Sequence, residues 1–388
     1  MNYRIINADE EEYRKFFNKS PYTFVTQNYN WDKVKSDWTS EKIIIKNGNK
    51  VVCTALLLFK KIPFTKWKLC YIPRGPLLDW TNKEEVKICL DLIKEYGRSR
   101  KAFVIKIDPY LKEDEEMINY IDSLGYKHQG YKKNFSYINP RYNMVTDLSK
   151  GEEVFNDFYK NIKYKVRKAE KNDLELVEGK LNEVNDFYEL VKTTGSRNEF
   201  NIRQKEYFYR LLSNLKEEAK LYFVRLDLNK LLEKQKEGLK DLAKEREKSK
   251  NPNSNNFLNS EKNLKETIKR AEELLKEGKT YINLTGNIMV YSGKHAEDLY
   301  AGSSNEFRNL SPNYFMKQEL MKIAIKDGME DFNFGGVSGY TNGEKEDTAP
   351  GLYEFKKVFA SEMVTLCGEF DYVINKFWYF LFKKIIKK

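Results

Sequence analysis

Histidine is nearly absent from this chain, and cysteine is scarce. The two histidines, His128 and His295, are too few for a His-rich metal site, and no Ser-His-Asp order is evident. The cysteines form no CxxC pair, and each stands in an apolar run, which is typical of buried free thiols in a reducing compartment. They are Cys53, Cys70, Cys89 and Cys367. The composition therefore argues against a zinc site, a disulfide framework and a histidine-dependent hydrolase.

Long hydrophobic runs and cofactor-binding loops are missing as well. No apolar run is long enough to cross a bilayer, and the opening Met1–Glu12 is polar and acidic, unlike a signal peptide. Nothing resembles a Walker loop, a Rossmann fingerprint or a zinc-ligand cluster. We therefore expect a cytoplasmic protein that needs no metal and no redox cofactor.

Aromatic residues and positive charge, in contrast, are plentiful. The 388 residues are 40% hydrophobic and 14% aromatic, which is enough for one large domain or two medium ones. The net charge of +11 and the pI of about 9.0 attract polyanions such as nucleic acid, phosphate ligands or an anionic membrane face. A solvated basic surface is the alternative.

Periodic segments in the first half of the chain indicate an α+β fold. Ile43–Lys46 and Val51–Phe59 flank a turn rich in Asn and Gly, which predicts a β-hairpin. Apolar residues at helical spacing predict a helix over Asn82–Ser99, and Ala102–Ile107 is expected to be a buried strand. Another strand is expected over Phe135–Ile138.

The second half has elements of the same kinds in a similar order. We expect a basic helix over Phe155–Glu170, a strand over Lys220–Asp227 and the last strand over Met363–Phe370. Two α+β halves of similar order suggest a duplicated fold, with a first domain over residues 1–147 and a second over residues 148–388.

A segment of another kind interrupts the second half. Asn229–Lys250 and Asn259–Lys279 are highly charged, lack aromatics and carry apolar or spacer positions at heptad spacing. These positions are Leu232, Gln235, Leu239 and Leu242, then Leu264, Ile268, Ala271 and Leu275. We predict an antiparallel coiled-coil arm over residues 229–280 that reaches a binding partner. The alternative is a solvated insertion without a partner.

One predicted helix carries a basic face. Lys160, Lys163, Arg167 and Lys171 fall on one side of it and suit the phosphates of tRNA or of a phosphorylated ligand. A solvated face is about equally compatible with the pattern. Near the end of the chain, Lys356 stands among aromatic residues, and a partly buried lysine needs an anionic partner or a function.

Several short stretches, each weak alone, together carry a family resemblance. They are Gln27–Lys35 (QNYNWDKVK), Tyr71–Pro76 (YIPRGP), Lys106–Pro109 (KIDP), Lys160–Lys171 (KNIKYKVRKAEK), Arg197–Arg203 (RNEFNIR), Ala301–Asn305 (AGSSN), Asn333–Gly339 (NFGGVSG) and Gly351–Phe359 (GLYEFKKVF). In this order, and with the coiled-coil arm between them, the chain resembles the FemABX peptidyltransferases over almost its whole length.

This resemblance implies a fold and a set of ligand-binding residues. The fold would be two GNAT-like (acyl-CoA N-acyltransferase-like) domains in tandem, with a helical hairpin like that of seryl-tRNA synthetase. By motif position, Lys35 and Arg203 would hold the diphosphate of a muramyl-peptide precursor. Tyr207 would contact its sugar or peptide, and Tyr300 and Phe355 would also bind substrate. The alternatives are surface charges and core aromatics.

The resemblance also implies a reacting centre. Lys356 matches a lysine near the reacting atoms, where it would stabilise an oxyanion or hold the tRNA 3′ end. Asp108 matches an acidic position considered as a base, although it also suits a strand-ending turn before Pro109.

The implied activity is that of an aminoacyltransferase which builds the peptidoglycan cross-bridge. Glycine, alanine or serine would pass from aminoacyl-tRNA to a stem-peptide amine of lipid II or UDP-MurNAc-pentapeptide. The alternatives are an acyl-CoA-dependent N-acyltransferase and a non-catalytic tRNA-binding protein. The aromatic, basic tail Asn375–Lys388 would rest on the inner face of the cytoplasmic membrane or pack as a helix on the first domain.

Overall fold

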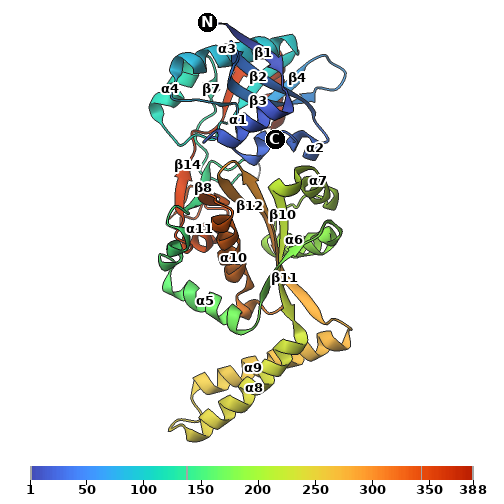
Figure 1. The fold of residues 1–388 in the computed structure, drawn as a ribbon, viewed down its shortest axis with the longest axis vertical. Helices are drawn as coiled ribbons and strands as arrows, with labels where there is room; N and C mark the ends of the chain where they lie inside the picture. Colours follow the sequence, from blue (N-terminus) through green and yellow to red (C-terminus); the bar gives the residue numbers. More distant parts are fainter. Residues whose placement is uncertain (1, 137–138, 342, 387–388) are drawn as a thin grey trace.

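The computed structural model describes residues 2–136, 139–341 and 343–386, which form two sheet-based domains and a projecting helical arm (Figure 1). Both ends of the chain lie in the first domain, and the arm extends from the far end of the second (Figure 1). The expected α+β architecture, two tandem domains with an inserted coiled coil, is confirmed.

The first sheet has the strand order β1-β2-β3-β4-β6-β15-β7, with β5 paired to β3. Its strands are β1 (Tyr3–Asn7), β2 (Thr39–Asn47), β3 (Lys50–Lys61), β4 (Lys68–Ile72), β5 (Leu77–Leu78), β6 (Ala102–Ile107), β7 (Lys127–His128) and β15 (Phe370–Val373). Its helices are α1 (Glu10–Lys19), α2 (Trp31–Val34), α3 (Lys83–Ser99), α4 (Glu115–Ser123) and α12 (Lys376–Ile386). The predicted hairpin, the helix over Asn82–Ser99 and the buried strand after it are therefore present.

The second sheet has the order β14-β8-β13-β12-β11-β10-β9. Its strands are β8 (Tyr142–Asp147), β9 (Glu175–Gly179), β10 (Ala219–Asp227), β11 (Tyr281–Ser292), β12 (His295–Ser303), β13 (Asp331–Val337) and β14 (Glu362–Thr365). Helices α5 (Lys160–Lys171) and α10 (Pro312–Lys326) lie on one face, and α6 (Val184–Asn198) and α7 (Lys205–Leu215) lie on the other. Helix α11 (Pro350–Lys357) packs on β8 and β13.

Each sheet contains one parallel pair among the described strand pairings, β4 with β6 and β12 with β13. The first pairing ends at Ile72 and Ile107, and the second ends at Glu297 and Asn333. Beyond these residues the two strands of each pair separate. The two domains therefore repeat one arrangement. We call the point where the parallel strands separate the fork: it lies between β4 and β6 in the first sheet and between β12 and β13 in the second.

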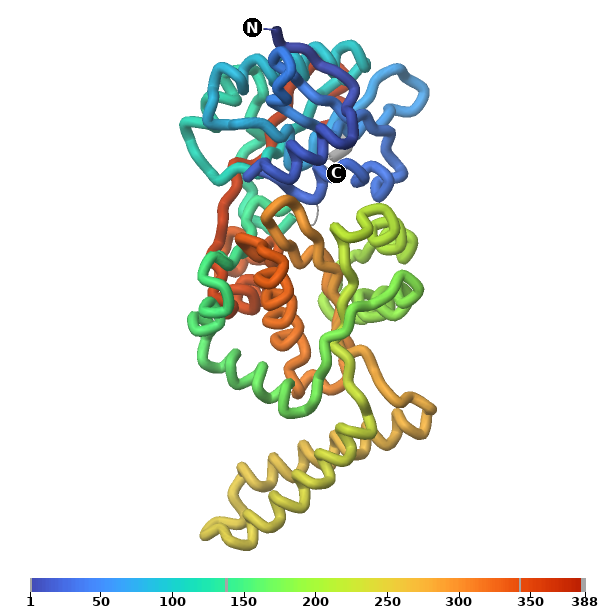
Figure 2. The backbone as a smooth tube through the Cα atoms, in the orientation of Figure 1, coloured from blue at the N-terminus to red at the C-terminus, as the bar shows by residue number. Residues whose placement is uncertain are grey.

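The two domains exchange strands. β8 lies at the end of the segment that we assigned to the first domain, yet it pairs with β13 and β14 in the second sheet. β15 comes from the end of the chain and inserts between β6 and β7 of the first sheet. Figure 2 shows this red segment rising from the second domain into the first. A division at residue 147 therefore does not separate the two sheets.

Two strand predictions also need correction. The single strand expected over Met363–Phe370 is β14 and β15, one strand in each sheet, because the chain crosses between the domains there. Phe135 and Ser136, at the start of the strand expected over Phe135–Ile138, lie outside any strand, and residues 137–138 lie outside the described residues. The basic helix begins at Lys160 and not at Phe155, because a 3₁₀ helix over Gly151–Asn156 precedes it.

The arm is the predicted antiparallel pair of helices. α8 (Leu228–Lys248) begins at an N-cap, Asp227, whose side chain accepts from two backbone N–H groups, and α9 (Asn255–Lys276) returns beside it. The heptad positions are half-buried or buried between the helices, and ion pairs such as Arg246–Glu261 (2.8 Å) link the helices from the outside.

A shared apolar cluster joins the domains. Trp31 and Val34 of α2 pack with Phe208 and Leu211 of α7 in one buried group. Polar contacts flank it, because Glu218 accepts from both Arg14 (3.1 Å) and Asn28 (2.8 Å) of the first domain. This interface fixes α2 against α7.

The glycine of the Ala301–Asn305 motif is required by packing. A Cβ on Gly302 would lie 2.6 Å from the backbone carbonyl carbon of Leu190 in α6, so helix and strand touch directly there.

We therefore expect Gly302→Ala to lower the free energy of unfolding by about 3 kcal/mol, since overpacking forces backbone shifts. The midpoint of urea denaturation measures this. Gly351→Ala is the control, because nothing lies within 4 Å of its added Cβ. Equal midpoints for the two variants would contradict the packing argument.

Candidate functional site

The structure brings Lys35 and Arg203 to the same aromatic ring from different domains. Lys35 follows α2, and its backbone N–H donates to the carbonyl of Trp31 (3.1 Å). Its Nζ lies 5.6 Å from the ring centroid of Tyr207, and the guanidinium carbon of Arg203 lies 5.3 Å from the same centroid. Such cation–π contacts contribute about 1 kcal/mol each. The two predicted diphosphate ligands are therefore neighbours.

These two cations have no counter-charge of their own. Among the described residues, neither side chain forms an ion pair within 4.0 Å. Burial and, to a smaller extent, the nearby charge of Arg203 lower the pKa of Lys35 to about 8, against an opposite effect of Asp37. Two like charges held together without an anion favour an anionic ligand.

Tyr207 and Tyr300 complete this group. The hydroxyl of Tyr300 on β12 donates to the hydroxyl of Tyr207 on α7 (3.0 Å). Burial raises the pKa of Tyr207 well above its usual value, and the nearby Tyr300 raises it further, so the phenol stays neutral. All four sequence-predicted residues, Lys35, Arg203, Tyr207 and Tyr300, thus lie together.

A bulge in β12 links this group to the fork of the second sheet. Tyr300 is opposite Ile288, but Asp298 is opposite Met289, so Leu299 is an extra residue. The extra residue shifts the alternation and turns Tyr300 and Glu297 to the same face of the sheet, while Asp298 turns to the other. Glu297 lies at the fork itself, beside Asn333.

Lys356 points into this fork from α11. Its Nζ donates to the carbonyl of Gly336 (2.7 Å), and a Cβ added to Gly335 would lie 3.8 Å from the same Nζ. Burial lowers the pKa of Lys356 to about 8, while Asp298 raises it and Lys317 lowers it. The ammonium of Lys356, with its lowered pKa, therefore lies at the place where β12 and β13 separate.

Buried polar groups on the other face of β12 support the fork. Asp298 is ion-paired to Lys317 of α10, whose side chain is 6% exposed, and it accepts from Asn287 of β11. All members of this network belong to the second domain. Because Asp298 is already paired with Lys317, it neutralises the charge of Lys356 only in part.

Asp108 lies at the fork of the first sheet and is fully engaged. It is 1% exposed and accepts from the backbone N–H of Arg74 (2.7 Å), the hydroxyl of Tyr71 (3.1 Å) and the amide of Asn139 (2.7 Å). Burial raises its pKa to about 6, against the charge of Arg74. In the structure its carboxylate is occupied by these donors and holds the backbone of Arg74. A role of Asp108 as a base at the reacting centre stays a prediction.

Arg74 connects the two forks. Its side chain is 2% exposed, and its Nη2 donates to the carbonyl of Pro140 (2.6 Å). Tyr110, whose ring lies 5.9 Å from the guanidinium carbon of Arg74, accepts from Asn333 of β13 (3.3 Å). The first fork therefore faces the second across the domain junction.

Phe355 packs on the core of the second domain. Its ring lies against Tyr314 (centroids 5.3 Å apart) and Phe359 (5.4 Å), and the side chain is half-buried. These contacts hold α11, which also carries Lys356. A contact of Phe355 with substrate stays a prediction.

The predicted basic face lies on the outside of the second domain. Lys160, Arg167 and Lys171 of α5 are exposed, and Lys163 is half-buried and donates to the carbonyl of Asn156 (2.9 Å). The end of α5 touches the base of the arm, where Lys234 donates to the carbonyl of Lys171 (3.0 Å). The basic face therefore ends beside the base of the arm. Figure 1 shows α5 and the arm at the same end of the second domain.

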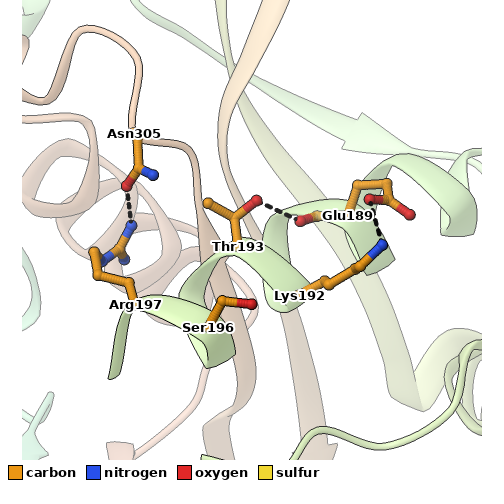
Figure 3. A pocket seen from close by; sticks show the side chains of 6 residues that line it. All are labelled: Glu189, Lys192, Thr193, Ser196, Arg197 and Asn305. Carbon is orange, nitrogen blue, oxygen red and sulfur yellow. Dashed lines mark hydrogen bonds and ion pairs between the residues drawn. The ribbon is translucent and has the colours of Figure 1, made fainter. Parts of the chain in front are cut away.

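Two open pockets lie elsewhere in the second domain. One of about 490 Å³ is lined by Glu189, Lys192, Thr193, Ser196, Arg197 and Asn305 (Figure 3). Arg197 donates to Asn305 (2.8 Å) and to the hydroxyl of Ser303 (2.8 Å), so two of the family-like stretches meet here. The contacts join the end of α6 to β12. The other pocket, of about 390 Å³, lies beside α7.

Glu297 was not among the residues singled out from the sequence. The face of β12 that it occupies depends on the bulge at Leu299, which no sequence pattern shows. Among the described residues, no group of three or more His, Cys, Asp or Glu side chains is arranged to hold a metal ion. No helix in the described ranges combines the length and the apolar character needed to span a membrane.

Comparisons with known proteins agree with this architecture. The model of the FemAB family matches residues 8–388. A lipid II:glycine glycyltransferase of Staphylococcus aureus is 34% identical over 402 aligned positions, which cover 98% of this chain and 95% of the relative. A crystal structure of FemX superposes with a TM-score of 0.81 at 32% identity, covering 97% of this chain and 99% of that one.

A more distant structure shows the fold alone. A tandem GNAT protein from the clavulanic acid biosynthesis pathway has a TM-score of 0.50 at 7% identity, covering 95% of this chain and 98% of that protein. The two-domain GNAT-like architecture is therefore established. With a family match over nearly its whole length, the chain belongs to the FemAB family.

Proposed function

We propose that this chain transfers an aminoacyl group from a charged tRNA to a stem-peptide amine of a peptidoglycan precursor. That it is an aminoacyltransferase follows from its family and from relatives named as glycyltransferases. The observation that carries the finer proposal is that two cations without an ion-pair partner among the described residues, Lys35 and Arg203, both lie against the ring of Tyr207. A sugar diphosphate supplies the anion that this pair lacks.

The two charges suit a diphosphate for complementary reasons. The guanidinium of Arg203 can bind phosphate oxygens in a fork, and the ammonium of Lys35 acts as a point charge. The neutral phenols of Tyr207 and Tyr300 add hydrogen-bonding groups beside them. We propose that the sugar and peptide of the precursor continue from here along β12.

The peptide would then reach the fork. Tyr300 and Glu297 lie three residues apart on one face of β12, a separation of about 10 Å. Lys356 lies at the same fork, so its ammonium can stabilise the oxyanion that forms when the amine attacks the ester carbonyl. An aminoacyl ester is already activated, and positioning supplies much of the remaining acceleration.

The charged tRNA would approach from the side of α5 and the arm. Lys160 follows Tyr159, whose backbone N–H donates to the carbonyl of Val358 at the end of α11 (3.2 Å). The basic face therefore starts next to the helix that carries Lys356 and leads to the arm. Phosphate contacts of this kind give affinity without reading sequence.

The similar relatives favour particular substrates. Their names specify lipid II and glycine, and we propose the same pair for this chain in preference to alanine, serine or a soluble nucleotide-linked acceptor. Labelled glycyl-, alanyl- and seryl-tRNA offered together with lipid II or UDP-MurNAc-pentapeptide, followed by sequencing of the product, test both choices. Acyl-CoA offered as the donor tests the N-acyltransferase alternative, and the non-catalytic alternative is excluded by the family.

We expect Lys356→Met to abolish transfer, with a fall in kcat of about 100-fold or more, because the oxyanion loses its ammonium. Transfer of labelled glycine from charged tRNA to precursor, retained on a filter, measures this. Precursor affinity should stay within about twofold, since Lys35 and Arg203 are intact. Lys357→Met, which loses an exposed i,i+3 pair with Glu354, is the control. Full activity of Lys356→Met would remove the lysine from the mechanism.

We further propose that the last helix holds the enzyme at the membrane surface. Phe382 of α12 packs on Phe103 of the first domain (5.5 Å between ring centroids). Phe377 and Phe380 are 63% and 55% exposed on another face, and Lys384 lies 4.5 Å from the ring centroid of Phe380. Exposed aromatics beside a lysine suit an anionic lipid surface.

The double change Phe377→Ser and Phe380→Ser should prevent co-sedimentation with phosphatidylglycerol vesicles, because the apolar contact is lost. Vesicles of phosphatidylcholine alone should retain less of the unmodified protein. Their headgroups carry no net negative charge, so the lysines of the helix are not attracted to them. Equal sedimentation of variant and unmodified protein with anionic vesicles would contradict this role of the helix.

A further inference from the structure

Among the described carboxylates near the two forks, Asp108, Asp298 and Glu297 differ in how they are held. Asp108 is buried and accepts from Tyr71, Asn139 and the backbone of Arg74. Asp298 is paired with Lys317 and accepts from Asn287. The side chain of Glu297, in contrast, makes no hydrogen bond and no ion pair within 4.0 Å to any described residue. Its side chain is half-buried, so a substrate group can reach it.

The position of Glu297 is set by the backbone. It is the last residue of β12 that pairs with β13, and its partner there is Asn333, whose amide donates to Tyr110 of the first domain (3.3 Å). Side chains of paired neighbours share a face of the sheet, so Glu297 faces the domain junction as Asn333 does. The bulge at Leu299 turns Tyr300 to this same face.

Four charged groups act on Glu297 electrostatically, but none forms an ion pair with it. They come from the turn after β4, from α11 and from the two strands of the fork: Arg74, Lys356, Asp298 and Asp331. The phenols of Tyr110 and Tyr300 are also within its electrostatic reach. Of Asp108, Asp298 and Glu297, only Glu297 has a carboxylate without a direct partner among the described residues. It is therefore the one that can bind the ammonium of a substrate.

We propose that Glu297 binds the ammonium of the acceptor peptide and takes its proton before attack. This inference rests on the proposed function and names a base for it. One N–H proton moves from the ammonium to a carboxylate oxygen of Glu297. The freed nitrogen lone pair attacks the ester carbonyl carbon, and a C–N bond forms. The bond from that carbon to the ribose oxygen breaks, and the departing oxygen takes the proton from Glu297, which restores the carboxylate. The nitrogen loses its second proton to solvent, so the products are a neutral amide, a ribose hydroxyl and one proton in water.

The electrostatics of the site suit this exchange. Burial raises the pKa of Glu297 to about 8, the charge of Arg74 lowers it, and Asp298 raises it again. A carboxylate with a raised pKa is a stronger base toward an ammonium than an ordinary glutamate. Activity should therefore rise with pH as Glu297 ionises. It should fall again as Lys356, whose pKa is about 8, loses its charge.

The test compares Glu297→Gln with unmodified enzyme on two acceptors. With the natural amine, kcat should fall about 100-fold near neutral pH, and the rising limb of the pH profile should disappear while the falling limb remains. With a precursor whose amine is replaced by a hydrazide, which is neutral at this pH, the two enzymes should agree within about threefold. Glu178→Gln on the exposed surface of β9 is the matched control.

A second variant protects the test against a failure of Glu297→Gln to fold. Glu297→Ala with added formate should recover activity toward the natural amine, because formate can occupy the space left by the carboxylate. Equal loss on both acceptors, or full activity of Glu297→Gln with the natural amine, would overturn the assignment while leaving the proposed function intact. If the unmodified enzyme transferred nothing from charged tRNA to either acceptor, the proposed function would fail, and this inference with it.

Discussion

The contact between α2 and α7 is the constraint on which the rest of the site depends. It buries Trp31 and Val34 against Phe208 and Leu211, and so holds the end of α2 beside Tyr207. Apolar burial of this kind contributes about 1.5–3 kcal/mol per large side chain, which far exceeds the repulsion of two partly solvated cations. The fold can therefore keep Lys35 next to Arg203 and keep both available to an anion.

The chain crosses between the domains twice, before β8 and before β15. Each of these strands pairs only within its own sheet, β8 in the second and β15 in the first. Separating the domains would break the apolar contact and the polar contacts of Glu218 with Arg14 and Asn28. The two forks are thus fixed relative to each other, and Arg74 and Tyr110 reach the second fork from the first. Catalysis by positioning requires such a fixed geometry.

Much of this could be predicted from the sequence, and the failures have physical causes. Local periodicity was sufficient to predict the β2–β3 hairpin, α3 and the arm. The motif matches also placed Lys35, Arg203, Tyr207 and Tyr300 correctly beside one another. The division at residue 147 failed because the pairing partner of β8 is set by contacts almost two hundred residues away along the chain.

Side-chain direction was the other limit. Phe355 and Lys356 are adjacent, yet one packs into the core and the other points into the fork. Asp108 matched a family position, but its three hydrogen-bond donors come from Tyr71, Arg74 and Asn139, which only the folded chain brings together. Glu297 was missed because a one-residue bulge decides which face it occupies. Such features depend on tertiary packing and not on spacing.

Titration of Lys35 is the sharpest test of whether the Lys35–Arg203 pair binds a diphosphate. NMR of enzyme labelled at lysine Nζ would follow its pKa with and without saturating precursor. Free enzyme should titrate near pH 8, as burial and Arg203 dictate. Bound diphosphate favours the charged ammonium, so the pKa of Lys35 should shift clearly upward. The same pKa in both states would contradict it.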